Sequence, residues 1–300
     1  MKNIRNASLM TAVKTPYLDN RKLDLKTFDR LVEKQIEGGV QGIIVGGTTG
    51  EGQLMSWDEH IMLIAHCVTH FSNDLIIVGN TGSNNTYEAC KATEQGFAVG
   101  MDVSLQINPY YGKTSNEGVT AHFEKLLDLG PTIIYNVPGR TGQDITPEII
   151  EPLAKYPNLL GIKECAGNER IQYYEERDIA CWSGNDDSSH RGRHQSKSHG
   201  VISVTSNIIP KTMRMLMDRQ NDVLNQKIEK LFQWLFCEPN PVPLNTIMAM
   251  MGIVKPIFRL PYVPLKQEIR DQGAAIFRSL ELNDVYSEIN SLADSDFICM

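Results

Sequence analysis

Short runs of apolar and β-branched residues recur at fairly even intervals along the first two-thirds of the chain. Within each run the apolar residues follow one another instead of alternating with polar ones, which is typical of strands buried on both faces of a parallel sheet. The pattern predicts eight strands, at residues 9–13, 42–46, 75–79, 103–107, 132–136, 160–163, 180–183 and 201–204.

Segments of helical period separate these strands, and several begin at recognisable signals. Asp24 is a predicted N-cap before the apolar positions of 25–36, and Ser56 with Glu59 forms a predicted capping box. Pro147 stands at a predicted first helical position. A strand followed by a helix, repeated eight times, predicts an α/β fold of the (β/α)8 TIM-barrel type.

A doubly wound open sheet is the alternative fold. It requires a glycine fingerprint directly after the first strand, where it binds the phosphates of a dinucleotide. The chain has Lys14, Thr15, Pro16 and Tyr17 at that place, so the barrel is favoured.

The strand pattern stops near residue 208, and the rest of the chain has helical period with proline-rich joints. We therefore expect a barrel over residues 1–222, carrying the active site, and a C-terminal helical extension over 223–300. One segment fits this scheme poorly. Residues 188–199 stand where the seventh outer helix belongs but include no apolar side chain to pack against the barrel, so we expect that helix to be missing or loosely docked.

Composition narrows the class of protein. The 300 residues are 41% hydrophobic and 22% charged, as in ordinary globular proteins, and the net charge of −7 argues against a nucleic-acid binder. No run approaches the roughly 18 apolar residues that cross a bilayer, so no membrane association is expected. Six scattered cysteines without a CxxC pair predict neither a disulfide scaffold nor a metal site, and favour a reducing compartment.

Polar groups at the predicted strand ends suggest chemistry. The segment GGTTGEG, residues 46–52, follows the second strand and offers backbone N–H groups and two hydroxyls to a small carboxylate or phosphate. A glycine-rich turn without a ligand is the other interpretation. Lys163 lies inside an apolar strand, where desolvation would populate a neutral amine able to form a Schiff base. A lysine that reaches solvent from the strand end is the alternative.

Two further side chains stand beside this lysine in the expected barrel. Tyr135 ends the fifth strand, next to the strand of Lys163, and its phenol is a candidate for proton transfer; a core tyrosine is the alternative. Arg140 follows in a loop and is placed to bind a second carboxylate.

The motifs GGTTGEG, NPYYGKT, YNVPGRTG and GIKEC, in this order, resemble those of the dihydrodipicolinate synthase family of pyruvate-dependent class I aldolases. The resemblance extends through WSGNDD, GVISVTSN, LFCEPNP and FRLPYVPL and so covers nearly the whole chain. The last two motifs, with GEGQLMSWDEH, are most similar to the plant branch.

The resemblance implies that Lys163 condenses with pyruvate and that the resulting enamine attacks L-aspartate-4-semialdehyde, a step of lysine biosynthesis. Thr48, Tyr135 and Tyr111 match the family's proton relay, with Tyr111 delivered across a subunit interface. Further positions match substrate-binding residues: Thr49 for the pyruvate carboxylate, Arg140 for the semialdehyde carboxylate, and Gly184 and Ile202 lining the pocket. It implies no metal and no organic cofactor, only a covalent pyruvate imine on Lys163.

By the same resemblance the protein is a homotetramer inhibited by L-lysine at a cleft between subunits. The matching positions are Gln53, Trp57, His60, Asn84, Glu88 and Tyr110, where Glu88 can meet an ammonium and Asn84 and Tyr110 offer hydrogen bonds. Plant members work in chloroplasts after losing a transit peptide; none is visible here, so we expect a mature form.

Two other functions stay open at this point. One is a sister aldolase, such as a sialic-acid lyase, which uses the same lysine with another aldehyde. The other is a barrel that binds lysine as a regulatory subunit without turnover. Steady-state turnover with pyruvate and aspartate semialdehyde, set against sister aldehydes, separates the three.

Overall fold

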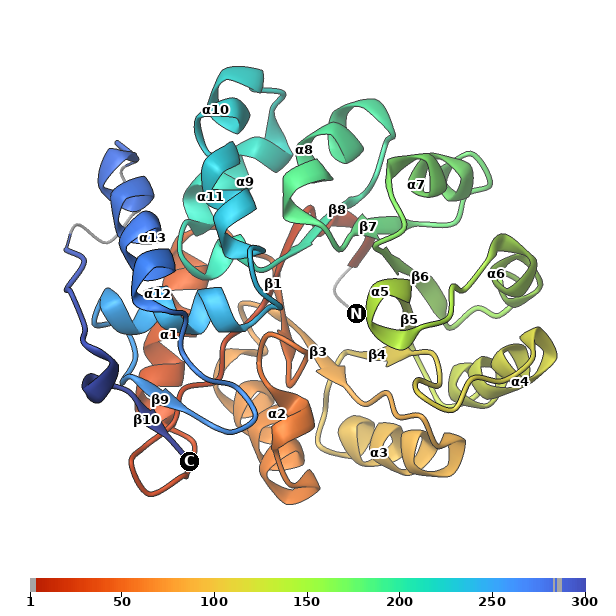
Figure 1. Ribbon diagram of the computed structural model, residues 1–300. Helices are drawn as coiled ribbons and strands as arrows, with labels where there is room; N and C mark the ends of the chain where they lie inside the picture. The colour runs from red at the N-terminus through yellow and green to blue at the C-terminus, as the bar shows by residue number, and fades with distance from the viewer. Residues whose placement is uncertain (1–3, 283, 285–287) are drawn as a thin grey trace.

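The computed structural model describes residues 4–282, 284 and 288–300, and its centre is a closed barrel of eight parallel strands in sequence order (Figure 1). The first and last strands pair with each other, Leu9 with Val201 and Met10 with Ile202, which closes the sheet. The strands are β1 Leu9–Ala12, β2 Gly42–Val45, β3 Ile76–Asn80, β4 Val103–Ile107, β5 Thr132–Asn136, β6 Leu159–Glu164, β7 Cys181–Ser183 and β8 Gly200–Ser203. The predicted barrel is confirmed, and every predicted strand overlaps an observed one.

Helices surround the barrel and connect its strands (Figure 1). They are α1 Leu25–Glu37, α2 Trp57–Phe71, α3 Thr86–Ala98, α4 Asn116–Leu127, α5 Pro138–Thr141, α6 Pro147–Leu153, α7 Asn168–Glu175 and α8 Asp186–Gln195, followed by α9 Pro210–Asp218 after the last strand. Asp24 caps α1 by accepting from the Thr27 N–H at 3.1 Å, and Ser56 with Glu59 forms the predicted capping box of α2. In the described part of the chain, no helix is long and apolar enough to cross a membrane.

Apolar side chains fill the space on both faces of the sheet. One group of buried residues lies inside the barrel, with Met10, Ile44, Leu105 and Trp182 among them. Others, such as Leu63 and Phe123, lie between the strands and the outer helices. This two-sided burial is the physical reason why the strands are continuously apolar.

The C-terminal helices pack against one side of the barrel, around a cluster that includes Val201, Met213, Phe232, Leu244 and Phe277. They are α10 Asp222–Lys227, α11 Glu229–Leu235, α12 Val242–Met250 and α13 Gln267–Ser279. The predicted helical extension is therefore present. A short parallel pair of strands, β9 Ile257–Phe258 with β10 Ile298–Cys299, joins the chain's end to it, and the sequence analysis did not predict this pair.

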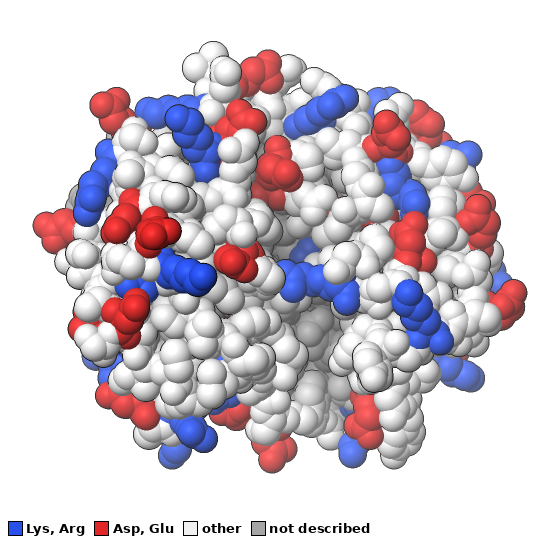
Figure 2. Space-filling model, in the orientation of Figure 1, with Lys and Arg blue, Asp and Glu red and all other residues white. Residues whose placement is uncertain are grey.

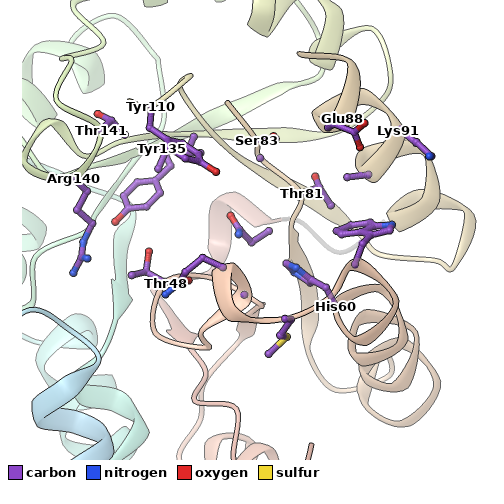
Figure 3. Close-up of a pocket in the computed structure, with 18 of the residues that line it drawn as sticks. Thr48, His60, Thr81, Ser83, Glu88, Lys91, Tyr110, Tyr135, Arg140 and Thr141 are labelled. Carbon is purple, nitrogen blue, oxygen red and sulfur yellow. The ribbon is translucent and has the colours of Figure 1, made fainter. Parts of the chain in front are cut away.

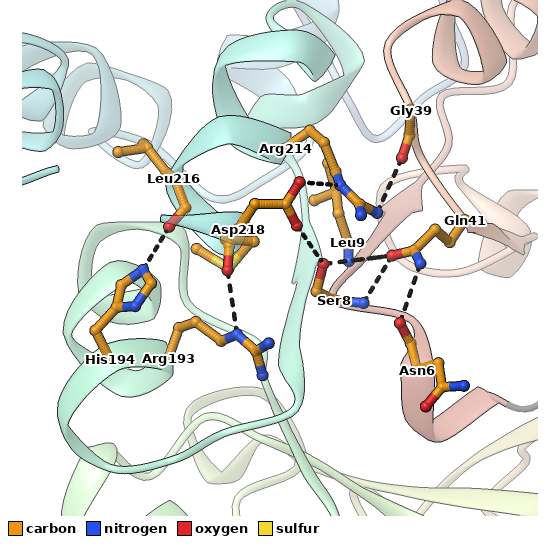
Figure 4. Close-up of polar contacts among 11 residues, drawn as sticks. Asn6, Ser8, Leu9, Gly39, Gln41, Arg193, His194, Arg214, Leu216 and Asp218 are labelled. Atoms are coloured by element: carbon orange, nitrogen blue, oxygen red, sulfur yellow. Dashed lines mark hydrogen bonds and ion pairs between the residues drawn. The ribbon is translucent and has the colours of Figure 1, made fainter. Parts of the chain in front are cut away.

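The prediction for residues 188–199 was wrong, because α8 is a regular helix that docks through polar groups (Figure 4). Arg193 donates to the Met217 carbonyl at 3.1 Å, and His194 contacts the Leu216 carbonyl at 2.8 Å. These carbonyls belong to the last turn of α9, where they lack partners within their own helix. Hydrogen bonds from Arg193 and His194 to the C-terminal end of α9 thus hold α8 in place of an apolar face.

On its other side α8 approaches α7 closely. A Cβ on Gly192 would lie 2.9 Å from Oδ1 of Asn168, and the Asn168 amide donates to the Ser188 carbonyl at 3.1 Å. Close backbone approach and hydrogen bonding therefore hold this helix on both sides.

Candidate active site

A cavity of about 630 Å³ lies where the strands of the barrel end. Its lining comes from successive strand ends and the segments after them: Thr48 and Thr49 after β2, Asn80 on β3, Tyr135 on β5, Lys163 on β6, Gly184 after β7 and Val204 after β8. Figure 2 shows the central hollow on the face seen in Figure 1, with charges of both signs scattered around it. Active sites of (β/α)8 barrels lie at this end.

Lys163 is 7% exposed and is held in register beside Tyr135 by the pairing of β5 with β6. Its Nζ lies 4.2 Å from the centre of the Tyr135 ring. Burial desolvates the ammonium and lowers the pKa of Lys163, which populates the nucleophilic neutral amine. The structure thus places both side chains, predicted from separate strands, at one point of the cavity.

The phenol of Tyr135 is a proton donor in this environment. Burial raises its pKa well above the usual value, so the hydroxyl stays protonated. Cys165, two residues after Lys163, also lines the cavity, and burial raises the pKa of its thiol. The sequence analysis did not single out Cys165.

Gly184 lines the cavity directly beside Lys163 and Cys165, where only a hydrogen atom fits. A Cβ at this position would lie 2.3 Å from Sγ of Cys165 and 3.1 Å from Cε of Lys163. Ile202, predicted to line the pocket, is buried among the side chains inside the barrel. Val204, just after the end of β8, lines the cavity instead.

Thr49, in the loop after β2, and Arg140 both contact Asn240, a residue from the C-terminal extension. The amide of Asn240 donates to Oγ1 of Thr49 at 3.0 Å, and Arg140 donates to the Asn240 carbonyl at 3.1 Å. Asn240 lies in the LFCEPNP motif, but no strand-end argument pointed to it, since it belongs to the segment before α12. Asn80, which donates to the Gly46 carbonyl at 2.9 Å, was also missed.

A second cavity, of about 580 Å³, shares part of its lining with the first. In Figure 3, Thr48, Tyr135 and Arg140 lie together, while His60, Glu88 and Lys91 lie on the other side. Five of the six predicted lysine-site residues line this second cavity: Gln53, Trp57, His60, Glu88 and Tyr110. The sixth, Asn84, is exposed and makes a long hydrogen bond of 3.5 Å to the Tyr110 carbonyl.

Trp57 and His60 form one wall of the second cavity. Their rings lie 5.1 Å apart, and the Trp57 indole donates to Oε1 of Gln95 on α3. Burial lowers the pKa of His60 to about 4, so its imidazole is neutral at pH 7. Lys91 also lines this cavity and was not predicted.

Tyr111, predicted to complete the proton relay, is 95% exposed and lies outside the lining of both cavities. A single chain therefore does not bring it to Lys163. This position accords with the expectation that it acts on a neighbouring subunit.

Glu164 is not among the residues that line the cavity, and its buried carboxyl group is expected to make the stability of the protein depend on pH. Its Oε1 accepts from the Asn136 amide at 2.9 Å and from the Ala166 N–H at 2.7 Å, while Oε2 is buried without a hydrogen bond. Burial raises its pKa from 4.5 to about 7. A raised acid pKa means that the native state binds the proton more tightly, so stability falls as pH rises from about 4.5 to about 7.

Glu164→Gln is therefore expected to stabilise the protein at pH 8, by up to about 3 kcal/mol, and to change little at pH 4.5. Thermal unfolding across this pH range measures the effect, with the exposed Glu169→Gln as the matched control. Equal pH dependence in the wild type and Glu164→Gln would contradict the assignment.

Among the described residues, no group of three or more histidine, cysteine, aspartate and glutamate side chains is arranged to hold a metal ion. The six cysteines, each within the described ranges, are free thiols in this structure.

A buried lysine and phenol at adjacent strand ends of a (β/α)8 barrel define the class of imine-forming aldolases. Sequence comparison agrees, since the profile of the dihydrodipicolinate synthetase family matches residues 5–280. The chain belongs to this family.

Two plant relatives are similar over almost the whole chain. The 4-hydroxy-tetrahydrodipicolinate synthase of Nicotiana tabacum, named chloroplastic, is 55% identical over 99% of this chain and 83% of the relative. Synthase 1 of Arabidopsis thaliana, also named chloroplastic, is 53% identical over 99% and 82%.

Two solved structures are also similar. The dihydrodipicolinate synthase of Acinetobacter baumannii, complexed with pyruvate, has a TM-score of 0.87 and 33% identity, covering 91% of this chain and 98% of the other. The enzyme of Cyanidioschyzon merolae with lysine bound has a TM-score of 0.85 and 28% identity, covering 92% and 98%.

Proposed function

We propose that this protein is a lyase that condenses pyruvate with L-aspartate-4-semialdehyde to give 4-hydroxy-tetrahydrodipicolinate in lysine biosynthesis. The observation that carries the proposal is the desolvated amine of Lys163 beside the Tyr135 phenol, in a cavity that also holds hydroxyls and an arginine. The plant relatives that are more than half identical are named for this activity.

The chemistry begins at Lys163. Its neutral amine attacks the ketone carbon of pyruvate, and loss of water leaves a protonated imine that draws electrons from the methyl group. Loss of a methyl proton gives an enamine, whose carbon attacks the aldehyde of the second substrate. Cyclisation through the substrate's own amine then releases Lys163. Since the substrate itself is the covalent partner, the proposed reaction uses no metal and no organic cofactor.

Proton transfers are assigned to a relay of hydroxyls. Tyr135 is adjacent to Lys163 and remains protonated, so it can donate to the leaving water. Thr48 lines the same cavity. Tyr111 of the partner subunit would complete the relay, which makes the active site dependent on the proposed homotetramer. Its near-complete exposure in one chain supports this assignment.

Two binding groups are proposed for the two carboxylates. The Thr49 hydroxyl, together with the backbone of the 46–52 loop, takes the pyruvate carboxylate beside Lys163. The guanidinium of Arg140 takes the semialdehyde carboxylate at the cavity mouth. Gly184 gives room for the imine, while Ile202 packs with the side chains inside the barrel.

Turnover with a panel of aldehydes tests this substrate assignment. With pyruvate saturating, we expect kcat/KM for aspartate semialdehyde to exceed that for sugar aldehydes by at least about 10²-fold, since Arg140 can bind only an acceptor that carries a carboxylate. Preference for a sugar aldehyde would instead identify a sister aldolase.

L-lysine is the proposed inhibitor, bound in the second cavity. Glu88 offers a carboxylate to one ammonium group, and the Tyr110 and Gln53 side chains offer hydrogen bonds. The cavity shares Thr48, Asn80, Tyr135 and Arg140 with the first, which provides a direct physical route from inhibitor to active site.

Trp57→Arg tests this assignment. A cation in the wall of the second cavity would repel the inhibitor's ammonium and remove the ring packed on His60, so we expect the half-inhibitory lysine concentration to rise at least about tenfold. Turnover without lysine should fall only modestly. Met62→Arg is the control, because it adds the same charge to α2 outside the cavity. Unchanged inhibition in Trp57→Arg would mean that lysine binds elsewhere.

The chloroplast is the proposed location, because the similar plant relatives are named chloroplastic.

A further inference from the structure

A buried ion pair joins the loop of residues 46–52 to the end of β1, and none of the roles assigned above uses this pair. Lys14, just after β1, pairs with Glu51 in the loop after β2, and the two side chains are 2% and 1% exposed. Asn245 on α12 donates its amide to the same carboxylate oxygen at 2.5 Å. Three separate parts of the chain therefore meet at Glu51.

The pair has little value as a source of stability. Removing two charges from water costs roughly as much as their attraction returns, and well-packed apolar residues often replace buried ion pairs without loss. Glu51 also has left-handed backbone geometry, with φ at +60°, which costs a non-glycine residue energy. A strained residue that carries a buried charge points to a geometric role.

What Glu51 fixes is the segment that carries the two threonines. Its N–H donates to the Thr48 carbonyl at 3.1 Å, and the next N–H, from Gly52, donates to the Gly47 carbonyl at 3.3 Å. These bonds close the loop into a tight turn around Thr48 and Thr49. The carboxylate then ties this turn to β1 through Lys14 and to the C-terminal extension through Asn245.

A second set of contacts surrounds the pair from the other side. The Tyr17 ring lies close to two basic side chains, with Nζ of Lys14 at 5.0 Å and Cζ of Arg259 at 4.3 Å from its centre. Arg259, in the FRLPYVPL motif, binds Glu59 at 2.6 and 2.9 Å and the Leu54 carbonyl at 3.0 Å. The FRLPYVPL motif, which has no role in the proposed function, thus holds the segment that directly follows the 46–52 loop.

We propose that Lys14 and Glu51 are positioning residues for the proposed reaction: together they set the 46–52 loop so that the Thr49 hydroxyl meets the carboxylate of the substrate bound at Lys163 and the Thr48 hydroxyl stays in the proton relay. This inference rests on the proposed function, because the substrate is pyruvate. The pair acts through the loop and touches no substrate.

The experiment compares Lys14→Met, Glu51→Gln and the double variant in the full-length protein, measuring kcat and KM for pyruvate. If the 46–52 loop is displaced, the Thr49 hydroxyl binds the pyruvate carboxylate less well, so we expect KM for pyruvate to rise at least about tenfold while kcat falls less. The double variant should resemble either single variant, because the two residues act as one unit. Lys255→Met is the control, since it breaks an exposed ion pair with Asp19.

Each outcome is decisive. A variant that merely loses stability would lower Tm and kcat together and leave KM for pyruvate unchanged, and a folded double variant with KM within twofold of wild type would overturn the proposal. If the single variants do not fold, the double variant, which buries no unpaired charge, and Asn245→Ala provide the same comparison. Failure of the pyruvate chemistry on which this inference rests looks different, because wild type itself would then form no borohydride-reducible adduct with pyruvate.

Discussion

Lys163→Ala is expected to abolish turnover, with kcat reduced by at least about 10³-fold, because Lys163 is the one primary amine among the described residues that line the cavity. The fold should survive this change. The wild-type amine is desolvated and lies against the Tyr135 ring, so its loss removes a buried polar group and no strand hydrogen bond. Steady-state kinetics and thermal unfolding of the purified variant measure the two effects.

Lys155→Ala is the matched control for this variant, because it removes an exposed lysine eight positions earlier. It should keep wild-type kinetics. Turnover at the wild-type rate in Lys163→Ala would refute the assignment of the nucleophile.

Gly184→Ala is expected to reduce kcat/KM by about 10²-fold, the second largest effect. The new methyl group would lie 2.3 Å from Sγ of Cys165 and 3.1 Å from Cε of Lys163, so both side chains have to move. A displacement of about 1 Å at a reacting amine is enough for a loss of this size. Kinetics of the variant, with Tm as a check of folding, measure it.

A second substitution separates crowding from other causes. Cys165→Ala in the Gly184→Ala background removes the closer of the two contacts, so part of the lost activity should return. Full activity in Gly184→Ala, or no recovery in the double variant, would show that steric exclusion is not the reason for this glycine.

The barrel could be predicted from sequence because burial on both faces imposes one strong pattern on its strands. The proximity of Lys163 and Tyr135 could likewise be predicted, since parallel strands end at one edge of the sheet. The helix α8 was mispredicted because amphipathic period detects only apolar docking, whereas Arg193 and His194 dock this helix on two carbonyl groups of α9. Such tertiary hydrogen bonds leave no periodic signal.

Asn240 and Asn245 were missed because their contacts join chain segments that lie far apart in sequence. Asn240 reaches Thr49 across 191 positions, and Asn245 reaches Glu51 across 194. Glu51 lies in the GGTTGEG motif, but its ion pair with Lys14 forms only when the barrel closes and therefore cannot be read from the sequence. The division of the chain at residue 222 stays a prediction, because buried side chains from both parts form one continuous cluster.

The central claim is that Lys163 is the nucleophile, and trapping its imine tests this most directly. The protein is incubated with pyruvate and borohydride, which reduces an imine to a stable amine, and the modified peptide is mapped by mass spectrometry. We predict one adduct, on the peptide that contains Lys163. An adduct on another lysine, such as the buried Lys14, or no adduct on the folded protein, would contradict the account.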